Sequence, residues 1–352
     1  MLNSLFSGDL PRSKALTLLL LVIFVGLAFA PFIFPGTRSL DTAARICIFI
    51  VLVASYDLLL GYTGIVSFAH TMFFGVGAYG VALASIHIGR GFDALIVGSL
   101  AGALVAAVLA TIIGLFSLRV RAIFFAMITL AVATAVAVLF SQMSGITGGE
   151  DGLNFKIPRA LTSAQKYMSD PLFGVKVNGK LMNYYLMLFG SLILLLVFLR
   201  ITNSPFGRVL QAIRENEFRA ESIGYKIVFF RTGASVISAV GAALAGSLYA
   251  IWLRYVGPDT TLSFEIMIDI LLMVVIGGMG TIYGAVIGAT IFVLAQNYLQ
   301  NLMVVAADAT QSLPVLPLIL NPDRWLLWLG ILFILSVYFF PSGVVGRLRG
   351  KR

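Results

Sequence analysis

Ten long runs of apolar residues constrain this chain more than any other feature of its sequence. A helix needs about 20 apolar residues to cross the hydrocarbon core of a bilayer, which is about 30 Å thick. Most of the runs have about that length, so we predict an all-α, polytopic integral membrane protein with about ten transmembrane helices, forming a single domain over residues 1–352. The predicted spans are Ala15–Phe34, Asp41–Leu60, Ile65–Ile88, Ala94–Leu118, Ala122–Gln142, Tyr184–Leu199, Thr232–Leu253, Glu265–Ile276, Ile282–Leu302 and Trp325–Phe340.

Composition excludes the soluble classes of protein. The chain is 60% hydrophobic and 11% charged, whereas soluble globular chains are about 45–50% apolar and about 25% charged. A chain of this size cannot hide so much apolar surface from water, so an ordinary soluble enzyme and a disordered chain are both excluded. The single cysteine, Cys47, also excludes an internal disulfide framework and a cysteine-based metal site.

The distribution of basic residues predicts the orientation in the membrane. Loops that face the cytoplasm carry an excess of Lys and Arg, and the net charge of the chain is +9. With ten spans, both termini lie on one side, which also carries the loop at 200–231 and most of the basic residues. We therefore predict cytoplasmic termini, a cytoplasmic loop at 200–231 and a periplasmic loop at 143–183. The basic residues on the predicted cytoplasmic side are Arg12, Lys14, Arg119, Arg121, Arg200, Arg208, Arg214, Arg219, Lys226, Arg231, Arg347, Arg349, Lys351 and Arg352.

No basic aromatic platform accompanies the positive charge, so contact with anionic lipid explains it better than nucleic acid does. The sequence also lacks the motifs of common enzymes. It contains no G-x-x-x-x-G-K-[ST] run for ATP, no serine–histidine–acid set and no H-E-x-x-H. Its two histidines have no metal-ligand spacing. We therefore predict neither a metal site nor a catalytic residue.

Glycines recur at helical spacing inside the spans. Gly75, Gly77 and Gly80 match G-x-G-x-x-G, but they lie within an apolar run rather than between a strand and a helix. Small residues in membrane helices allow close helix–helix contact, so packing is the favoured interpretation over nucleotide binding. Two further sets predict the same kind of contact, one at 98 and 102, the other at 280, 284 and 288 on a single helix face.

A polar stretch connects the second and third spans. Its glycines and hydroxyl groups lie between Asp57 and His70. A broken helix there would direct backbone N–H groups into a cavity, as in many carriers. A tight cytoplasmic turn with locally satisfied polar groups is the alternative, which we favour. On the broken-helix hypothesis, the residues that line a substrate pathway are Tyr62, Thr63, Ser67 and His70.

Two acidic residues lie at the outer end of the eighth span. Glu265 and Asp269 are spaced i, i+4 and share a helix face. We predict a structural acidic pair that interacts with a neighbouring helix. By the same spacing, Arg45 is predicted to pair with Asp41.

The segment from Phe206 to Gly224 has the pattern of a short amphipathic helix that ends at glycine. One interpretation is a helix on the membrane surface, and the other is a helix that docks into a groove on a cytoplasmic partner. The apolar contacts are expected from Leu210, Ile213, Phe218 and Ile223.

Five sequence runs together resemble the branched-chain amino-acid ABC permeases of the LivM type. They occur in the order typical of that family, and the resemblance covers roughly residues 40–346. The runs are GYTGIVSFAHTMFFGVGAY at 61–79, TGGEDG at 147–152, GRVLQAIRENE at 207–217, VIGGMGT at 275–281 and PSGVVG at 341–346.

This resemblance implies a non-catalytic permease subunit in a bacterial inner membrane. Its expected partners are a second, related permease chain, two cytoplasmic ATPases and a periplasmic substrate-binding protein. ATP and magnesium would bind the ATPases, so no cofactor is expected on this chain. Branched-chain or related hydrophobic amino acids would cross by alternating access.

The resemblance also implies where the ATPases bind. The segment Glu217–Gly224 is similar to the loop by which importer permeases dock on their ATPases, although the common E-A-A triplet six residues before the glycine is replaced here. The docking residues expected from the resemblance and the amphipathic pattern are Arg208, Arg214, Glu217, Ala220, Glu221 and Gly224.

Two alternatives of different kinds remain. Related permeases are thought to transport urea or short amides. A self-sufficient secondary carrier or channel would instead use Asp57, His70, Glu265 and Asp269 as an ion relay, but the scarcity of charge within the spans weighs against it.

Overall fold

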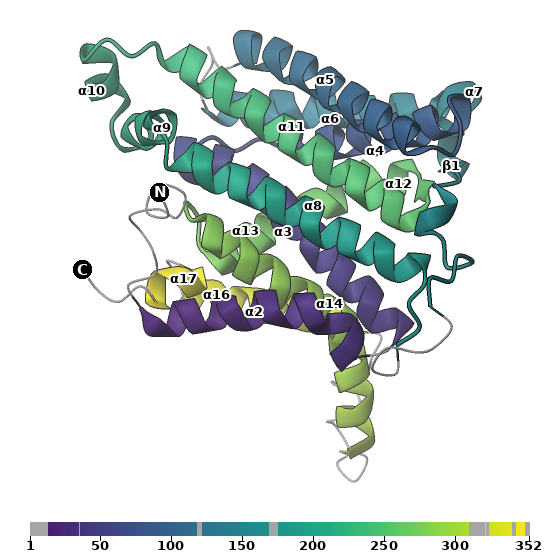
Figure 1. Cartoon of the computed structure of the whole chain (residues 1–352). Coiled ribbons are helices and arrows are strands. Elements are labelled where there is room, and N and C mark those ends of the chain that lie inside the picture. Colours follow the sequence, from purple (N-terminus) through teal and green to yellow (C-terminus); the bar gives the residue numbers. More distant parts are fainter. Residues whose placement is uncertain are drawn as a thin grey trace.

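Long helices lie side by side in one bundle in the computed structural model of this chain (Figure 1). The structure describes residues 13–34, 36–117, 122–168, 175–309, 321, 324–339 and 343–348. The long helices are α2 (Lys14–Ile33), α3 (Thr37–Thr63), α4 (His70–His87), α5 (Phe92–Ser117), α6 (Ala122–Gln142), α8 (Gly179–Thr202), α11 (Ile227–Leu253), α13 (Phe264–Gly277), α14 (Ile282–Ala309) and α16 (Trp325–Phe339).

Each predicted span coincides with one of these helices. Within the described residues, eight helical stretches are long and apolar enough to cross a membrane: α2, α3, α5, α6, α8, α11, α14, and α13 together with the preceding α12 (Pro258–Thr261). The other two predicted spans correspond to α4 and α16, with 18 and 15 residues. The all-α, polytopic membrane class is therefore confirmed, while the count of ten crossings stays a prediction.

Short elements occupy the two ends of the bundle (Figure 1). We call one the α9 end, which carries α9 (Pro205–Glu215), α10 (Glu217–Ser222) and α17 (Gly343–Leu348). We call the opposite one the β1 end, where β1 pairs antiparallel with β2. The elements of the β1 end are α7 (Ser144–Thr147), η1 (Gly149–Asp151), β1 (Leu153–Asn154), η2 (Arg159–Leu161), β2 (Tyr255–Val256) and α12.

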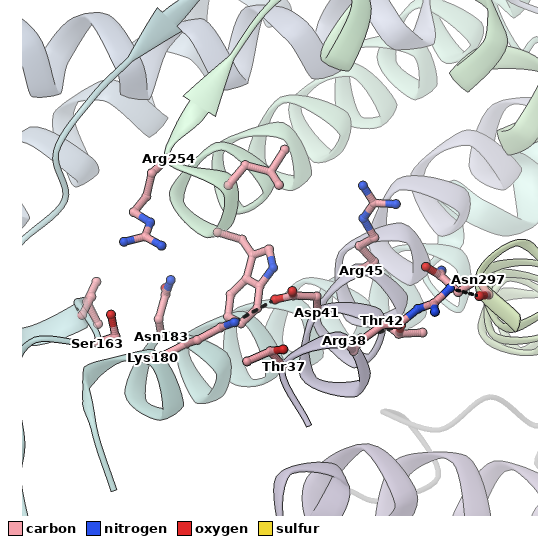
Figure 2. Close-up of a pocket in the computed structure, with 13 residues that line it drawn as sticks. Thr37, Arg38, Asp41, Thr42, Arg45, Ser163, Lys180, Asn183, Arg254 and Asn297 are labelled. Carbon is pink, nitrogen blue, oxygen red and sulfur yellow. Dashed lines mark hydrogen bonds and ion pairs between the residues drawn. The ribbon is translucent and has the colours of Figure 1, made fainter. Parts of the chain in front are cut away.

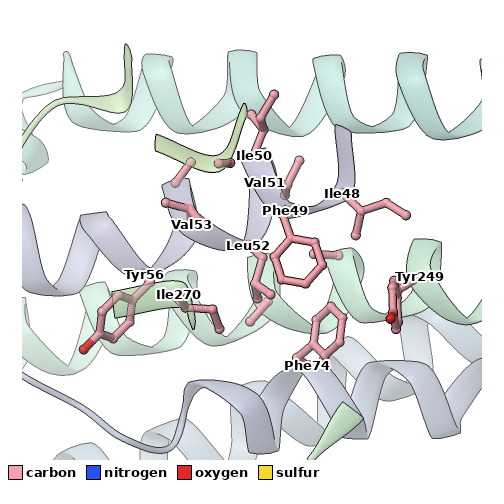
Figure 3. Packing of buried hydrophobic residues seen from close by; sticks show 14 of the residues in the cluster. Ile48, Phe49, Ile50, Val51, Leu52, Val53, Tyr56, Phe74, Tyr249 and Ile270 are labelled. Carbon is pink, nitrogen blue, oxygen red and sulfur yellow. The ribbon is translucent and has the colours of Figure 1, made fainter. Parts of the chain in front are cut away.

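Helix α3 lies at the centre of the bundle. In its most apolar stretch 83% of the residues are buried, against 11% in α6. Large side chains from α3, α4 and α11 fill the space around it (Figure 3). The rings of Phe74 and Tyr249 lie 5.3 Å apart, and Phe49 meets Tyr249 edge-on at 6.2 Å. In contrast, α5 and α6 expose rows of apolar side chains, as expected for a surface that faces lipid or another membrane chain.

Glycines allow α4 to lie against both α5 and α11. A methyl group built on Gly80 would lie 2.6 Å from the Gly98 oxygen, and one on Gly102 would lie 2.9 Å from the Gly77 Cα. A methyl group on Gly77 would collide with the backbone of Ala243. The interpretation of these glycines as packing residues is confirmed, because their missing side chains let three helix backbones approach closely.

Two of the sequence predictions about neighbouring residues are wrong. Gly280 does not share a helix face with the later glycines, because it lies at φ +82° in the turn before α14. Asp41 pairs with Lys180 of α8 at 3.1 Å, rather than with Arg45 one turn along α3. The basic residues Arg12, Arg119, Arg121, Arg349, Lys351 and Arg352 lie outside the described residues.

Candidate functional site

The predicted docking segment consists of two helices rather than one. Asn216 has φ −156° and ψ 100°, so the chain leaves helical geometry between α9 and α10. The side-chain oxygen of Asn216 then accepts a hydrogen bond from the Arg219 N–H at 2.9 Å and caps the start of α10. The expected single amphipathic helix is therefore wrong in this detail, since the asparagine cap interrupts it.

One face of this segment is anchored in the bundle. Leu210, Ile213 and Ala220 are buried. The rings of Phe206 and Phe230 stack at 5.8 Å, which fixes the start of α9 against the start of α11. Burial of these apolar groups holds the segment in one position relative to the long helices.

The opposite face exposes two large apolar side chains among charged and polar residues. Phe218 is 84% exposed and Ile223 is 70% exposed. The sequence pattern places Phe218 and Ile223 on the same apolar face as Leu210 and Ile213. Because the helix breaks at Asn216, Leu210 and Ile213 are buried whereas Phe218 and Ile223 are exposed. Whether this exposed pair on α10 and the turn after it meets a protein partner or the membrane surface stays a prediction.

The other residues predicted for docking lie around this exposed pair. Glu217 accepts two hydrogen bonds from the Arg231 guanidinium, at 3.0 and 3.1 Å, which ties α10 to α11. Arg208 and Glu221 are exposed, and Gly224 lies in the turn after α10 at φ +100°. Their roles in docking stay predictions.

Arg214 is exposed and reaches from α9 to the end of α3. Its guanidinium donates a hydrogen bond to the carbonyl oxygen of Gly61, near the end of α3. The side chain crosses two glycines at positive φ: methyl groups would lie 3.3 Å from Arg214 Cγ if built on Gly64, and 2.9 Å from Nη1 if built on Gly280. These glycines therefore make the space through which Arg214 reaches α3.

A second set of contacts continues from this point. The N–H of Gly280 donates to Asp57 Oδ1 of α3 at 2.8 Å. Asp57 is 1% exposed, so this bond partly satisfies a buried carboxylate. On the other side of the same turn, Gly343 at the start of α17 lies against the backbone of Gly278.

Four of the five sequence runs singled out above therefore meet at one place, which we call the coupling junction. It is made of Gly61 and Asp57 on α3, the turn at Gly278–Gly280, Arg214 on α9 and Gly343 on α17. The junction joins the segment from α9 to α10 to α3, to the turn between α13 and α14, and to α17. Sequence reasoning missed it because its members are separated by tens to hundreds of residues.

The residues predicted for a substrate pathway lie between α3 and α4. The chain is irregular over residues 64–69, and the Phe68 N–H donates to Thr129 of α6 at 3.1 Å, so the polar groups are not all satisfied locally as the favoured turn requires. Thr63 donates to the Leu59 carbonyl at 2.5 Å, and Ser67 accepts from the N–H of Ala69 at 3.3 Å. Tyr62 is buried here too.

His70 is also buried, with its Nε2 atom 2.8 Å from Ser55 Oγ and 3.3 Å from the Leu52 oxygen. A pathway role for these four residues stays a prediction.

The acidic pair lies on α13. Asp269 accepts a hydrogen bond from Gln296 of α14 at 3.4 Å, whereas Glu265 is exposed. Over the described part of the chain, no group of three or more His, Cys, Asp or Glu side chains is placed to hold a metal ion.

A comparison with protein-family models gives a match over residues 39–337 to the family described as branched-chain amino acid transport system / permease component. The match covers most of the chain, including the central helices and every member of the coupling junction except Gly343. The chain belongs to the branched-chain amino acid permease family. It is thus a permease component of a membrane transport system, and its multi-pass helical structure fits that class.

Curated relatives of this permease agree. It is 28% identical to the high-affinity branched-chain amino acid transport system permease protein LivM of Salmonella typhimurium strain LT2 over 329 residues, which is 90% of this chain and 75% of the relative. The LivM of Escherichia coli K12 is 27% identical over the same shares. A probable LivM of Methanocaldococcus jannaschii is 25% identical over 72% of this chain and 69% of its own. No solved structure matches the permease significantly.

Proposed function

We propose that this permease is the non-catalytic membrane subunit of an ATP-driven importer for branched-chain or related hydrophobic amino acids. Its family and its relatives' names support the substrate class. It would work in a bacterial inner membrane with a second permease chain, two cytoplasmic ATPases that bind ATP and magnesium, and a periplasmic substrate-binding protein. The α9 end would face the cytoplasm and the β1 end the periplasm.

The observation that carries this proposal is the two-sided character of the segment from α9 to α10. Its outer face exposes Phe218 and Ile223, while Arg214 on its inner face binds the end of α3. A motor that binds the outer face would move α3 and the turn before α14 through the coupling junction. ATP would thereby bias an equilibrium between inward-open and outward-open states.

The first test removes the exposed aromatic ring. Phe218→Ala should weaken association with the ATPases about tenfold or more, because interface aromatic residues contribute much of the binding free energy. Phe189→Ala is the matched control, since Phe189 is also exposed (58%) but lies in the middle of α8. The measurement is recovery of the co-expressed ATPases with the detergent-solubilised permease. Equal recovery with both variants would contradict the docking assignment.

A reconstitution assay separates this proposal from a self-sufficient carrier. Leucine uptake into proteoliposomes should require the ATPases, the second permease and the binding protein. Uptake by this chain alone under a proton gradient would contradict the proposal and favour the carrier.

A further inference from the structure

A cavity of about 520 Å³ at the β1 end is unusually rich in cations. It lies where α3 and α8 begin and α11 ends, and Asn297 of α14 closes one side (Figure 2). Its volume is within the range of small-molecule sites. Its charged lining residues are Arg38, Arg45, Lys180 and Arg254, with Asp41 as the single carboxylate.

Within the described residues, only one of these four cations, Lys180, pairs with a carboxylate. Lys180 Nζ lies 3.1 Å from Asp41 Oδ1, and Arg38 donates to the Asn297 carbonyl at 2.8 Å. Neither Arg45 nor Arg254 forms an ion pair with a carboxylate within the described residues. Two guanidinium groups are therefore available to an anion. The N-termini of α3 and α8 add partial positive charge on the same side.

Asn183 gives an independent indication of a ligand. It lines the cavity and is 4% exposed, yet its Oδ1 atom has no hydrogen-bond partner within the described residues. A buried amide oxygen without a donor is costly and uncommon. A ligand that carries an N–H group would satisfy it.

The backbone at Arg254 gives a third indication. Arg254 follows the last residue of α11 at φ +60° and ψ +21°, and it is the only non-glycine residue at positive φ within the described residues. Glycine is the common residue at this position after a helix, because it adopts the left-handed conformation without strain. The chain instead places a guanidinium there, at the edge of the cavity.

The rest of the lining is mixed, with three apolar residues beside the hydroxyl groups of Thr37, Thr42 and Ser163. Trp252, Leu161 and Leu253 line the cavity, and Lys180 Nζ lies 5.6 Å from the centre of the Trp252 ring. The cavity thus combines free cations, an unpartnered acceptor, one carboxylate and apolar surface.

We propose that this cavity binds a free amino acid with an apolar side chain. The guanidinium group of Arg254 would bind its carboxylate, and Arg45 would add positive charge from the opposite side of the cavity (Figure 2). Asn183 and Asp41 would bind its ammonium group, and Trp252 its side chain. The inference rests on the proposed function, which supplies the substrate class and places the β1 end in the periplasm. It adds a substrate-binding site on the permease itself.

The test is Arg254→Gly. This variant removes the cation and relieves the positive-φ strain, so the fold should be at least as stable. L-leucine binding to the purified permease is measured in phosphatidylcholine nanodiscs, where no anionic headgroup competes. We expect leucine affinity to fall about ten- to a hundredfold, the range for a lost charge-assisted hydrogen bond. Arg254→Lys should restore part of it.

Arg90→Gly is the matched control. Arg90 is exposed in the turn between α4 and α5 and does not line the cavity. It should leave leucine affinity within about twofold. Two leucine analogues probe the chemistry: 4-methylpentanoate, which lacks the ammonium group, should compete with leucine better than isopentylamine, which lacks the carboxylate. Equal affinity in the wild type and Arg254→Gly would overturn the proposal, and so would better competition by the amine.

The cations of the cavity could instead bind a carboxylate on the surface of the binding protein. If Arg254→Gly weakens association of the substrate-free binding protein and leaves leucine affinity unchanged, the cavity is a docking surface and the proposal is wrong. Leucine transport by the wild-type assembly distinguishes failure of the proposed importer function from failure of the proposed cavity site. If the wild type fails to transport leucine, the proposed function fails. If it transports leucine and Arg254→Gly does so with unchanged kcat and KM, only the cavity proposal fails.

Discussion

Arg214 connects the surface of this permease to its interior. Its side chain starts on α9, next to the exposed apolar pair on α10, and ends at the Gly61 carbonyl of α3. Helix ends leave carbonyl oxygens without partners, and a guanidinium is well suited to satisfy one. A position predicted from sequence as part of a docking surface therefore also contacts a central helix.

This geometry predicts that binding and coupling can be separated. Arg214→Ala leaves Phe218 and Ile223 in place, so association with the ATPases should stay within about twofold. Leucine transport by the assembled complex should fall about two- to thirtyfold, the usual range for a residue that couples two sites. Transport and ATPase recovery are measured on the same preparation. Arg214→Lys, which keeps the charge but loses the planar fork, should be intermediate.

The outcome distinguishes the two roles of Arg214. If Arg214→Ala reduces recovery of the ATPases as strongly as Phe218→Ala does, Arg214 acts in docking itself and the coupling role is wrong.

At the scale of elements, α4 depends on glycine for its position between α5 and α11. Gly77 lies against the backbone of Ala243, which cannot move aside as a flexible side chain could. The packing of three helices therefore depends on the absence of a single methyl group.

Gly77→Ala should accordingly destabilise the permease by about 1–3 kcal/mol, the usual cost of overpacking. Gly26→Ala in α2 is the matched control, since a methyl group there would meet nothing within 4 Å. It should be neutral or stabilising by about 0.5–1 kcal/mol, because alanine favours helix. Thermal unfolding in detergent measures both. Equal melting temperatures for the two variants would contradict the packing account.

At the scale of the whole molecule, the orientation in the membrane can be tested by labelling introduced cysteines. The chain has only one native cysteine to remove first. Cys47 is buried, so a background without it should fold normally as Cys47→Ala. In that background Gly91→Cys, in the exposed turn between α4 and α5, should react with a membrane-impermeant maleimide added from the periplasm. Ser222→Cys on α10 should react only after the inner membrane is opened. The reverse labelling pattern would show that the α9 end faces the periplasm. It would contradict the proposed orientation and the proposed docking of cytoplasmic ATPases on α10.

Hydropathy was enough to predict every long helix, because the length of a membrane span is set by the bilayer and not by its neighbours. The same reasoning failed where a local hydrogen bond decides the structure. The cap at Asn216 divides one amphipathic pattern into two helices, and the turn at Gly280 interrupts a glycine repeat.

Contacts between distant segments were not predictable from the sequence alone. The pairing of Asp41 with Lys180 instead of Arg45 depends on which helix lies beside α3. The coupling junction and the cationic cavity are likewise assembled from helices whose neighbours hydropathy does not specify. Their residues were visible in the sequence, but their proximity was not.

The contact between α4 and α5 has a mechanical consequence. Where Gly77 and Gly80 lie against Gly98 and Gly102, the backbones of the two helices are in direct contact. A displacement of α4 along α5 at these glycines removes no side chain from a groove between neighbouring side chains. Small shear displacements therefore meet little resistance. This contact can therefore accommodate small displacements of α4 along α5 without repacking of side chains between these glycines.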